Sequence, residues 1–391
     1  MREKVIIVKY GEIAMRGNNR KLFVARLVKA IRKNIDPFGN FYVALEQGRL
    51  VVESRGAEMD WEVLLPRITC IFGIFGACPG WKLTDDAIEA IRAAACDLMK
   101  EQFDGHSSTF KVVTKRGNKK YPLDSNAISA EVGEAVLAAL PQLTVDVHHP
   151  QQTLYVEVRN HVYLYTSFVP GWGGLPYGSS GKAISLLSGG IDSPTATFLM
   201  AKRGVEVEGV YFHTPPYTSE RAKKKVESLA KILAGFTGGF TLHVVNFTKV
   251  QLYLLDHVPE EKLTIFLKRA MVHTAEQIAL EQKAQALVMG DSVGQVASQT
   301  VPAIEAISSA TQLPILRPLC GMDKQEIVDL AKKTGTFETS IEPYEDCCTV
   351  FVAKHPETKP KRSVIEAMER HLQALPELMA EAAAGRETMQ F

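Results

Sequence analysis

The sequence predicts an α/β protein with a parallel β-sheet domain in its C-terminal half, preceded by two smaller α+β modules. Three observations predict this fold class. After residue 180, short apolar segments alternate with helical segments, which is the order of a parallel sheet with helices on both faces. Before residue 169, helices alternate with single strands and hairpin-like strand pairs. Between the two halves, residues 169–180 are dense in Gly and Pro and predict a linker.

Composition is that of an ordinary globular protein. The chain has 391 residues, 46% hydrophobic and 23% charged, and roughly two to four domains are expected at this length. No apolar run of roughly 18 residues is present and the N-terminus lacks signal-peptide order, so we expect a cytoplasmic protein without membrane contact. The six Cys include no C-x-x-C pair, which gives zinc and iron–sulfur sites little support.

The first module, residues 1–60, predicts one strand, one helix and a strand pair. The strand covers residues 4–10, and the strand pair covers residues 41–53 around Gln47-Gly48. In the helix between them, apolar side chains recur every four residues. The apolar residues of this helix are Phe23, Leu27, Ile31 and Ile35.

The second module, residues 61–168, predicts two helices and three strands. One helix is expected at residues 85–100, with acidic residues in its first turn. The other is expected at residues 125–140, opened by an Asp124 cap. The expected strands are 110–114, 154–158 and 162–168.

The C-terminal half predicts the parallel sheet. Its expected strands are residues 183–187, 205–212, 240–245 and 286–289. Its expected helices are residues 194–203, 219–233 and 265–282, and a helical tail is expected over residues 363–386. Such sheets bind ligands at the carboxyl ends of their strands.

The loop Ser188-Gly189-Gly190-Ile191-Asp192-Ser193 lies between an apolar strand and a helix. A helix N-terminus attracts phosphate, two glycines allow close backbone approach, and Ser hydroxyls donate hydrogen bonds. The loop lacks the lysine of a Walker A motif. Because Asp192 would repel polyphosphate without an intervening cation, it implies Mg²⁺. The alternative is a plain strand–turn–helix with a Gly-Gly turn and a Ser cap.

The segment Leu186-Leu187-Ser188-Gly189-Gly190-Ile191-Asp192-Ser193-Pro194 resembles the PP-loop of ATP pyrophosphatases, enzymes that cleave ATP between its α- and β-phosphates and adenylate a carbonyl oxygen. Further segments, in the right order, resemble the tRNA 4-thiouridine synthetase (tRNA sulfurtransferase) family. These segments are Gly11-Glu12-Ile13, Arg16-Gly17-Asn18-Asn19-Arg20, Lys115-Arg116-Gly117-Asn118-Lys119-Lys120-Tyr121-Pro122, Thr218-Ser219-Glu220-Arg221-Ala222, Gly290-Asp291-Ser292, Gly294-Gln295-Val296-Ala297-Ser298-Gln299-Thr300, Arg317-Pro318-Leu319, Asp323-Lys324-Gln325-Glu326 and Pro343-Tyr344-Glu345-Asp346-Cys347-Cys348.

This resemblance implies the domain organisation. It implies a ferredoxin-like α+β module over residues 1–60, a THUMP RNA-binding α+β domain over residues 61–168 and a linker over residues 169–180. It implies a PP-loop ATP pyrophosphatase domain, with its helical tail, over residues 181–391. The implied activity is ATP-dependent formation of 4-thiouridine at position 8 of tRNA.

The resemblance also implies the functional residues. Implied catalytic residues are Asp192, Lys324, Cys347 and Cys348. The ATP-binding residues expected are Leu186, Leu187, Ser188, Gly189, Gly190, Asp192, Ser193, Tyr211, Phe212, Lys268, Arg269, Gly290 and Gln299. The RNA-binding residues expected are Arg16, Arg20, Lys115, Arg116, Asn118, Lys119 and Lys120, whose alternative role is that of solvated basic loops.

Two choices stay open at this point. Either Lys268 or Arg269 could reach the ATP phosphates, so both are retained. Counting forward from Lys324 places the family's sulfur-handling Cys at Cys347, whereas counting back from Pro356 places it at Cys348. Two buried thiols are the alternative for this pair.

We expect the short form of the family, without a C-terminal rhodanese domain, because the chain ends at Phe391 after the tail. Sulfur would then come directly from a cysteine desulfurase to Cys347 or Cys348. A homodimer is expected by resemblance. The competing functions are another PP-loop tRNA-modifying enzyme, a PP-loop amide ligase and a non-catalytic tRNA-binding protein.

Overall fold

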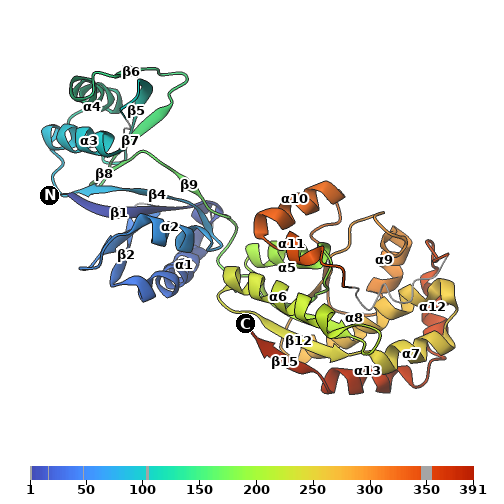
Figure 1. The fold of residues 1–391 in the computed structure, drawn as a ribbon. Coiled ribbons are helices and arrows are strands. Elements are labelled where there is room, and N and C mark those ends of the chain that lie inside the picture. The colour runs from blue at the N-terminus through green and yellow to red at the C-terminus, as the bar shows by residue number, and fades with distance from the viewer. Residues whose placement is uncertain (1, 16, 47, 103–104, 345–354) are drawn as a thin grey trace. The chain divides into compact units, whose positions relative to one another are not determined.

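The computed structural model of the chain divides into two compact units, Met1–Pro176 and Tyr177–Phe391 (Figure 1). It describes all residues except 1, 16, 47, 103–104 and 345–354. Each unit has its own sheet and its own hydrophobic core. Among the described residues, no helix is long and apolar enough to cross a membrane.

The first half of the N-terminal unit is a sheet with two helices packed on it. Its elements are β1 (Arg2–Tyr10), α1 (Arg20–Ile35), β2 (Phe41–Glu46), β3 (Arg49–Ser54), α2 (Trp61–Thr69) and β4 (Ile74–Leu83). The predicted strand, helix and strand pair are confirmed. On α1, Leu27, Ile31 and Ile35 are buried as part of the predicted face, and Phe23 is partly buried and packs against the same core. Val24 is buried as well.

The second half of this unit continues the same sheet. Its elements are α3 (Ile88–Gln102), β5 (Ser108–Arg116), α4 (Ser125–Ala139), β6 (Leu143–Val145), β7 (Gln152–Val158), β8 (Val162–Tyr165) and β9 (Val169–Pro170). The strand order is β2-β3-β1-β4-β8-β7-β5-β6, with β9 on β4. The expected Asp124 cap accepts a hydrogen bond from the Ala127 N–H at 2.8 Å.

The pairing of strand β4 bears on the boundary between the two modules. Strand β4 lies within residues 61–168, yet it pairs with β1 along almost its whole length and with β8 only at Trp81–Leu83. Helix α2 packs with α1 and β4 on the first module. Both elements therefore complete the first module, and we propose that the boundary follows β4 rather than residue 60.

A buried ion cluster joins strands of this sheet. The Glu157 carboxylate, 1% exposed, pairs with Arg49, with the Arg159 Nε at 2.9 Å, and accepts a hydrogen bond from the Tyr165 hydroxyl at 2.6 Å. Burial alone would raise the pKa of Glu157, but the two guanidinium groups and the hydroxyl lower it to about 2. The charged form is thus the stable one in the folded chain.

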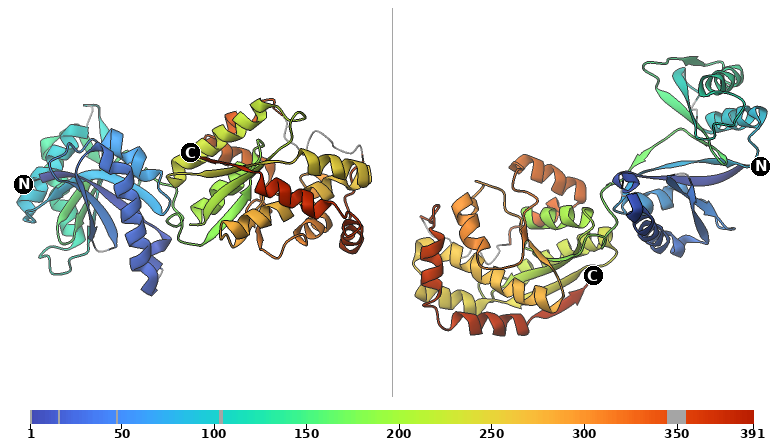
Figure 2. Two further views of the ribbon diagram at one scale, coloured as in Figure 1. Left: turned by 90° about the horizontal axis from the view of Figure 1, so that it is seen from below. Right: turned by 180° about the vertical axis from the view of Figure 1, so that it is seen from behind.

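The C-terminal unit is a six-stranded α/β sheet. Its elements are β10 (Lys182–Leu186), α5 (Asp192–Lys202), β11 (Glu206–His213), α6 (Glu220–Thr237), β12 (Thr241–Asn246), α7 (Thr248–His257), α8 (Leu263–Glu281), β13 (Ala286–Val288), α9 (Val301–Ser308), β14 (Ile315–Leu316), α10 (Lys324–Thr334), α11 (Phe337–Ser340), α12 (Arg362–Glu369), α13 (Leu375–Ala384) and β15 (Glu387–Gln390). The order is β14-β13-β10-β11-β12-β15, parallel except for β15. Helices α5 and α6 cover one face, and α8 and α13 cover the other (Figure 2). The predicted parallel sheet is confirmed.

The helical tail differs from its prediction. It forms two helices, α12 and α13, and then β15, which pairs antiparallel with β12. Pro376 lies in the first turn of α13. Backbone N–H groups in the first turn have no acceptor within the helix, so a proline, which lacks this N–H, costs no hydrogen bond there. This allows a second helix to start after the break.

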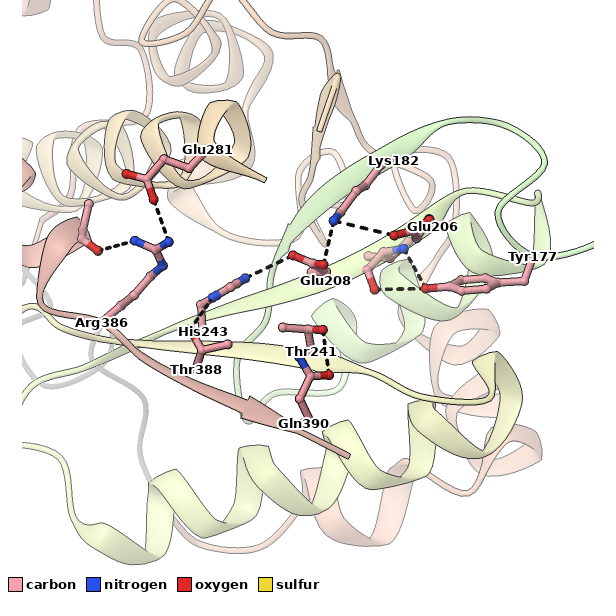
Figure 3. A network of polar contacts seen from close by, with 12 residues as sticks. Tyr177, Lys182, Glu206, Glu208, Thr241, His243, Glu281, Arg386, Thr388 and Gln390 are labelled. Atoms are coloured by element: carbon pink, nitrogen blue, oxygen red, sulfur yellow. Dashed lines mark hydrogen bonds and ion pairs between the residues drawn. The ribbon is translucent and has the colours of Figure 1, made fainter. Parts of the chain in front are cut away.

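A row of polar side chains crosses the sheet and ends on β15 (Figure 3). Glu208 accepts from Lys182 at 2.7 Å and lies 3.1 Å from the His243 Nε2. The His243 Nδ1 is 3.1 Å from the Thr388 hydroxyl, and Arg386 donates to Glu281 at 2.6 Å. The row connects β10, β11, β12 and β15, so it holds the last strand on the sheet.

We predict that Glu157→Gln destabilises the N-terminal unit at pH 7 by about 3 kcal/mol, from the change in pKa between 4.5 and about 2. A lowered pKa stabilises the fold above the unfolded pKa, so this contribution should be lost as the pH falls from about 4.5 towards 2. All three Trp lie in this unit, so urea unfolding followed by Trp fluorescence reports on it.

The matched control is Glu131→Gln. Glu131 pairs with Arg92 at 3.1 Å on the exposed surface, and such pairs contribute roughly 0–1 kcal/mol. Equal destabilisation by both substitutions would contradict a special role for the Glu157 cluster.

Candidate functional site: a nucleotide cavity at the Ser188–Ser193 loop

Hydrogen bonds between its first and last residues, both serines, stabilise the conformation of the Ser188–Ser193 loop. The Ser188 N–H donates to the Ser193 Oγ at 2.7 Å, and the two hydroxyl oxygens lie 3.0 Å apart. The Gly190 N–H donates to the Ser188 Oγ at 3.3 Å. Helix α5 begins at Asp192, two residues earlier than predicted, so its N-terminal turn forms part of the loop.

Gly290 brings the end of β13 against this loop. A Cβ at Gly290 would lie 2.8 Å from the backbone carbon of Asp192 and from the backbone nitrogen of Ser193. Real Cβ atoms do not approach backbone this closely, and backbone cannot rotate away as a side chain would. Only glycine therefore allows this contact between β13 and α5.

A cavity of about 610 Å³ opens beside the loop. This is within the range of small-molecule sites, roughly 300–1,000 Å³. Of the expected ATP-binding residues, it is lined by Leu186, Leu187, Ser188, Asp192, Ser193, Tyr211, Phe212, Lys268, Gly290 and Gln299. The expected residues Gly189, Gly190 and Arg269 are not among the lining residues.

Lys268 and Arg317 meet on one buried carboxylate at the cavity. The Asp291 Oδ1 lies 3.2 Å from the Lys268 Nζ, and its Oδ2 accepts from the Arg317 Nε at 2.9 Å. Burial alone would raise the pKa of Asp291, but the Lys268 ammonium and the Arg317 guanidinium hold it below its usual value. The three groups together place positive charge where phosphate would enter.

Arg269 points away from the cavity. It is 2% exposed and pairs with Glu369 on α12 through two nitrogens, and it donates to the Ser309 hydroxyl at 2.7 Å. Neighbouring residues on a helix point about 100° apart, so Lys268 and Arg269 face different surroundings. We therefore keep only Lys268 in the proposed ATP-binding set.

Asp192 and Lys324 form an ion pair at the mouth of the loop. The Lys324 Nζ lies 2.7 Å from the Asp192 Oδ1, and the Gln295 Nε2 donates to the Oδ2 at 2.8 Å. Lys324 opens α10, which begins with a capping box between Asp323 and Glu326. The Lys324 ammonium group thus lies directly beside the Asp192 carboxylate.

Cys347 and Cys348 lie outside the described residues, but the described segments on both sides of them contact the Ser188–Ser193 loop or its cavity. Before the gap, the Ser340 hydroxyl donates to the Gly190 carbonyl at 3.3 Å. After the gap, Pro356 and Glu357 line the cavity. Glu357 is fixed there by Lys262 at 3.0 Å.

The expected RNA-binding residues have two different environments. Lys115, Lys119 and Lys120 are exposed. The Arg116 Nη1 instead donates to the carbonyls of Tyr121 and Leu123, at 3.1 Å each. The Asn118 side-chain oxygen accepts a hydrogen bond from the Lys120 N–H at 3.0 Å, and Arg20 donates one to the Tyr10 hydroxyl at 2.9 Å. The last expected RNA-binding residue, Arg16, lies outside the described residues.

Sequence reasoning missed three residues of the site. Asp291, Gln295 and Arg317 stood in the family-like segments without an assigned role. An acidic residue directly after an apolar strand of a parallel sheet is a signal that could have identified Asp291. Within the described ranges, no three His, Cys, Asp or Glu side chains lie close enough together to bind one metal ion.

Three family models match the chain. Residues 178–374 match "Thiamine biosynthesis protein (ThiI)", residues 5–78 match the ThiI ferredoxin-like domain, and residues 86–167 match the THUMP domain. A "Probable tRNA sulfurtransferase" of Lachnoclostridium phytofermentans is 47% identical over 99% of both chains. Another of Acetivibrio thermocellus is 47% identical over 99% of this chain and 98% of its own. The chain belongs to the tRNA sulfurtransferase family.

A solved structure supports the same assignment for this family member. The crystal structure of a 4-thiouridine synthetase–RNA complex with bound ATP covers 100% of both chains, with 38% sequence identity and a TM-score of 0.90. The predictions of a ferredoxin-like module, a THUMP domain, a PP-loop domain and a tRNA-thiolating transferase are confirmed.

We predict that Gly290→Ala weakens ATP binding by at least about tenfold, or about 1.4 kcal/mol. The new methyl group would press on the backbone of α5 and displace the loop. Titration calorimetry with ATP measures the change. Gly321→Ala is the matched control, because a Cβ there meets nothing within 4 Å. Unchanged affinity in Gly290→Ala would rule out the loop as the phosphate site.

We predict opposite effects for the neighbouring pair on α8. Lys268→Met should lower ATP affinity and leave thermal stability nearly unchanged, because Arg317 still neutralises Asp291. Arg269→Met should lower the free energy of unfolding by roughly 3–5 kcal/mol, because it removes a buried guanidinium and leaves the partly buried Glu369 without that partner. Calorimetry and thermal unfolding of both variants check this. The reverse pattern would mean that Arg269, not Lys268, serves ATP.

Proposed function

We propose that the cavity binds ATP and that the enzyme adenylates O4 of the uridine at position 8 of tRNA. The uridine O4 would attack the α-phosphate, a bond would form between O4 and phosphorus, and pyrophosphate would leave. The uridine N3 proton would pass to water as the attack proceeds. One observation carries the proposal: the PP-loop and Lys268 line one cavity of suitable size, and Lys324 pairs with Asp192 on the wall of that cavity.

Each residue of the cavity has a proposed task. The N-terminus of α5 and the Ser188–Ser193 loop bind phosphate oxygens. Lys268, held by Asp291, and Lys324, held by Asp192, stabilise the charge that develops on the leaving pyrophosphate. The apolar side chains of Leu187 and Phe212 lie along the cavity wall, where a base can pack. ATP use is supported by the 38% identical 4-thiouridine synthetase, whose crystal structure has ATP bound.

Mg²⁺ is proposed to enter with ATP. Its usual shell of phosphate oxygens, waters and one or two carboxylates is compatible with Asp192 as a single protein ligand. Both Asp192 oxygens already accept contacts, from Lys324 and Gln295, so the ion would need Lys324 to move towards phosphate. When bound, Mg²⁺ would neutralise phosphate charge.

The sulfur is proposed to come from Cys347 or Cys348. A cysteine desulfurase would leave a persulfide on one of them. The terminal sulfur would attack C4 of the adenylated uridine, the C4–O bond would break, and AMP would leave, which gives a cysteine–S–S–C4 adduct. A thiol reductant in the reaction mixture would then attack the cysteine sulfur, break the S–S bond and release 4-thiouridine, and it would itself end in a disulfide with that cysteine, which a second thiol reduces. The exposed lysines Lys115, Lys119 and Lys120 would bind tRNA phosphates. We also propose that the enzyme is a homodimer and that it works in the cytoplasm.

The decisive experiment measures two products from the purified full-length chain. With ATP, tRNA, a cysteine desulfurase and cysteine, we expect pyrophosphate and 4-thiouridine, detected as tRNA retarded in a mercury-containing gel. Pyrophosphate without thiouridine would favour another tRNA modification. Neither product, with intact tRNA binding, would favour a non-catalytic tRNA-binding protein.

We predict that the Cys347→Ser/Cys348→Ser double variant loses at least about 99% of thiouridine formation, because serine cannot carry a persulfide. Adenylation, read as tRNA-dependent pyrophosphate release, should continue. The single variants then show which Cys carries sulfur. A Cys320→Ser variant is the control, since Cys320 is a free thiol in the same unit. Full thiolation by the double variant would refute the proposed sulfur route.

A further inference from the structure

The Asp192 carboxylate at the PP-loop is held from two sides. Its Oδ1 lies 2.7 Å from the Lys324 Nζ, and its Oδ2 accepts a hydrogen bond from the Gln295 Nε2 at 2.8 Å. The proposed function gives a task to Lys324 and none to Gln295. The Lys324 side chain is 48% exposed, and an exposed ion pair restrains a long side chain only weakly. The position of the ammonium group therefore depends on how firmly Asp192 is fixed.

Gln295 belongs to a turn whose backbone is fixed by hydrogen bonds. The Gln295 N–H donates to the Ser292 carbonyl at 3.3 Å, and the Gly294 N–H donates to the Gln299 carbonyl at 2.9 Å. Gly294 has a φ of +79°, a left-handed conformation that glycine adopts without strain and that suits the third position of such a turn. The side-chain amide of Gln295 thus extends from a rigid backbone.

The same turn is tied to the segment that carries Lys324. The Ser292 hydroxyl donates to the Met322 carbonyl at 2.8 Å, and Met322 lies two residues before Lys324. A further backbone hydrogen bond of 3.3 Å joins the turn to the same segment. These bonds set the spacing between the two segments that bring Gln295 and Lys324 to Asp192.

The Gln295 amide has a cost for the stability of the fold. Its Oε1 is buried and, among the residues that the structure describes, has no hydrogen-bond partner. A buried acceptor without a partner destabilises a protein, and an apolar side chain of similar shape would fill the same space without this cost. Unsatisfied buried polar groups are found where they serve a function. The hydrogen bond from Nε2 to Asp192 supplies such a function.

We infer that Gln295 is a positioning residue for adenylation. It fixes one oxygen of Asp192, so that the other oxygen holds the Lys324 ammonium beside the PP-loop. A cation that is already in place stabilises developing charge without reorganisation, and a displacement of about 1 Å can lower a rate by about 100-fold. Gln295 is not among the residues that line the cavity, so it acts through Asp192 and Lys324. The inference rests on the proposed adenylation.

A double-mutant cycle between Gln295 and Lys324 tests the inference. We expect Gln295→Met to lower kcat for tRNA-dependent pyrophosphate release by about 10- to 100-fold, while the ATP affinity from calorimetry and the thermal unfolding temperature stay nearly unchanged. In a Lys324→Met background, the same substitution should lower kcat by less than about twofold more, because the ammonium group that Gln295 positions is already absent.

The matched control is Gln325→Met. The Gln325 Nε2 also donates to an aspartate, the Asp329 Oδ1 at 2.8 Å, but it does so on the exposed surface of α10. This substitution should leave kcat unchanged, both alone and together with Lys324→Met. It shows whether the loss of any glutamine–aspartate hydrogen bond in this unit affects the rate.

Three outcomes would overturn the inference. An unchanged kcat in Gln295→Met would show no role, and equal losses in both backgrounds would show that Gln295 does not act through Lys324. A loss of kcat together with thermal stability would show a structural role. If Gln295→Met fails to fold, the cycle is run with Gln295→Asn, whose shorter side chain keeps the amide but cannot reach Asp192. If the unsubstituted enzyme releases no pyrophosphate with ATP and tRNA, the proposed adenylation itself fails.

Discussion

The backbone contact between Gly290 and the first turn of α5 is the constraint on which the site depends. The parallel pairing of β10 and β13 brings their carboxyl ends to the same edge of the sheet, and Gly290 lets the chain after β13 lie directly against the loop that follows β10. The next residue, Asp291, then projects its carboxylate between Lys268 and Arg317. One close approach thus sets both the phosphate loop and the cations beside it. A larger residue at position 290 would separate the two.

The two lysines of the site are each held by an ion pair with an aspartate. Each is held by an aspartate before any phosphate arrives, Lys268 by Asp291 and Lys324 by Asp192. The aspartates differ in burial: Asp291 is enclosed, whereas Asp192 lies at the loop itself. A fixed cation lowers the reorganisation needed when charge develops. Because Asp192 is the less buried of the two, it can exchange the Lys324 ammonium for another partner. Asp291 is enclosed and keeps its guanidinium and ammonium neighbours.

Local signals made most of the fold predictable, and long-range contacts account for what was missed. The apolar strand, the Gly-Gly loop and the following helix are consecutive in sequence, so the Ser188–Ser193 loop could be predicted directly. The choice between Lys268 and Arg269 could not, because apolar residues surround α8 on most sides and leave no clear polar face. Glu369, the partner of Arg269, lies 100 residues away. The pairing of β4 with β1 and of β15 with β12 is equally non-local.

The shared strand β4 limits how the N-terminal unit can be divided. A fragment ending at residue 60 would lack β4 and would leave β1 with an unpaired edge along its apolar residues. Open apolar edges recruit other chains and promote aggregation. The same cut would carry β4 away from β1 and leave it paired only at Trp81–Leu83, with β8, and at Gly76 and Ala77, with β9. Exchange of RNA-binding modules between relatives should therefore transfer residues 1–176 as one piece.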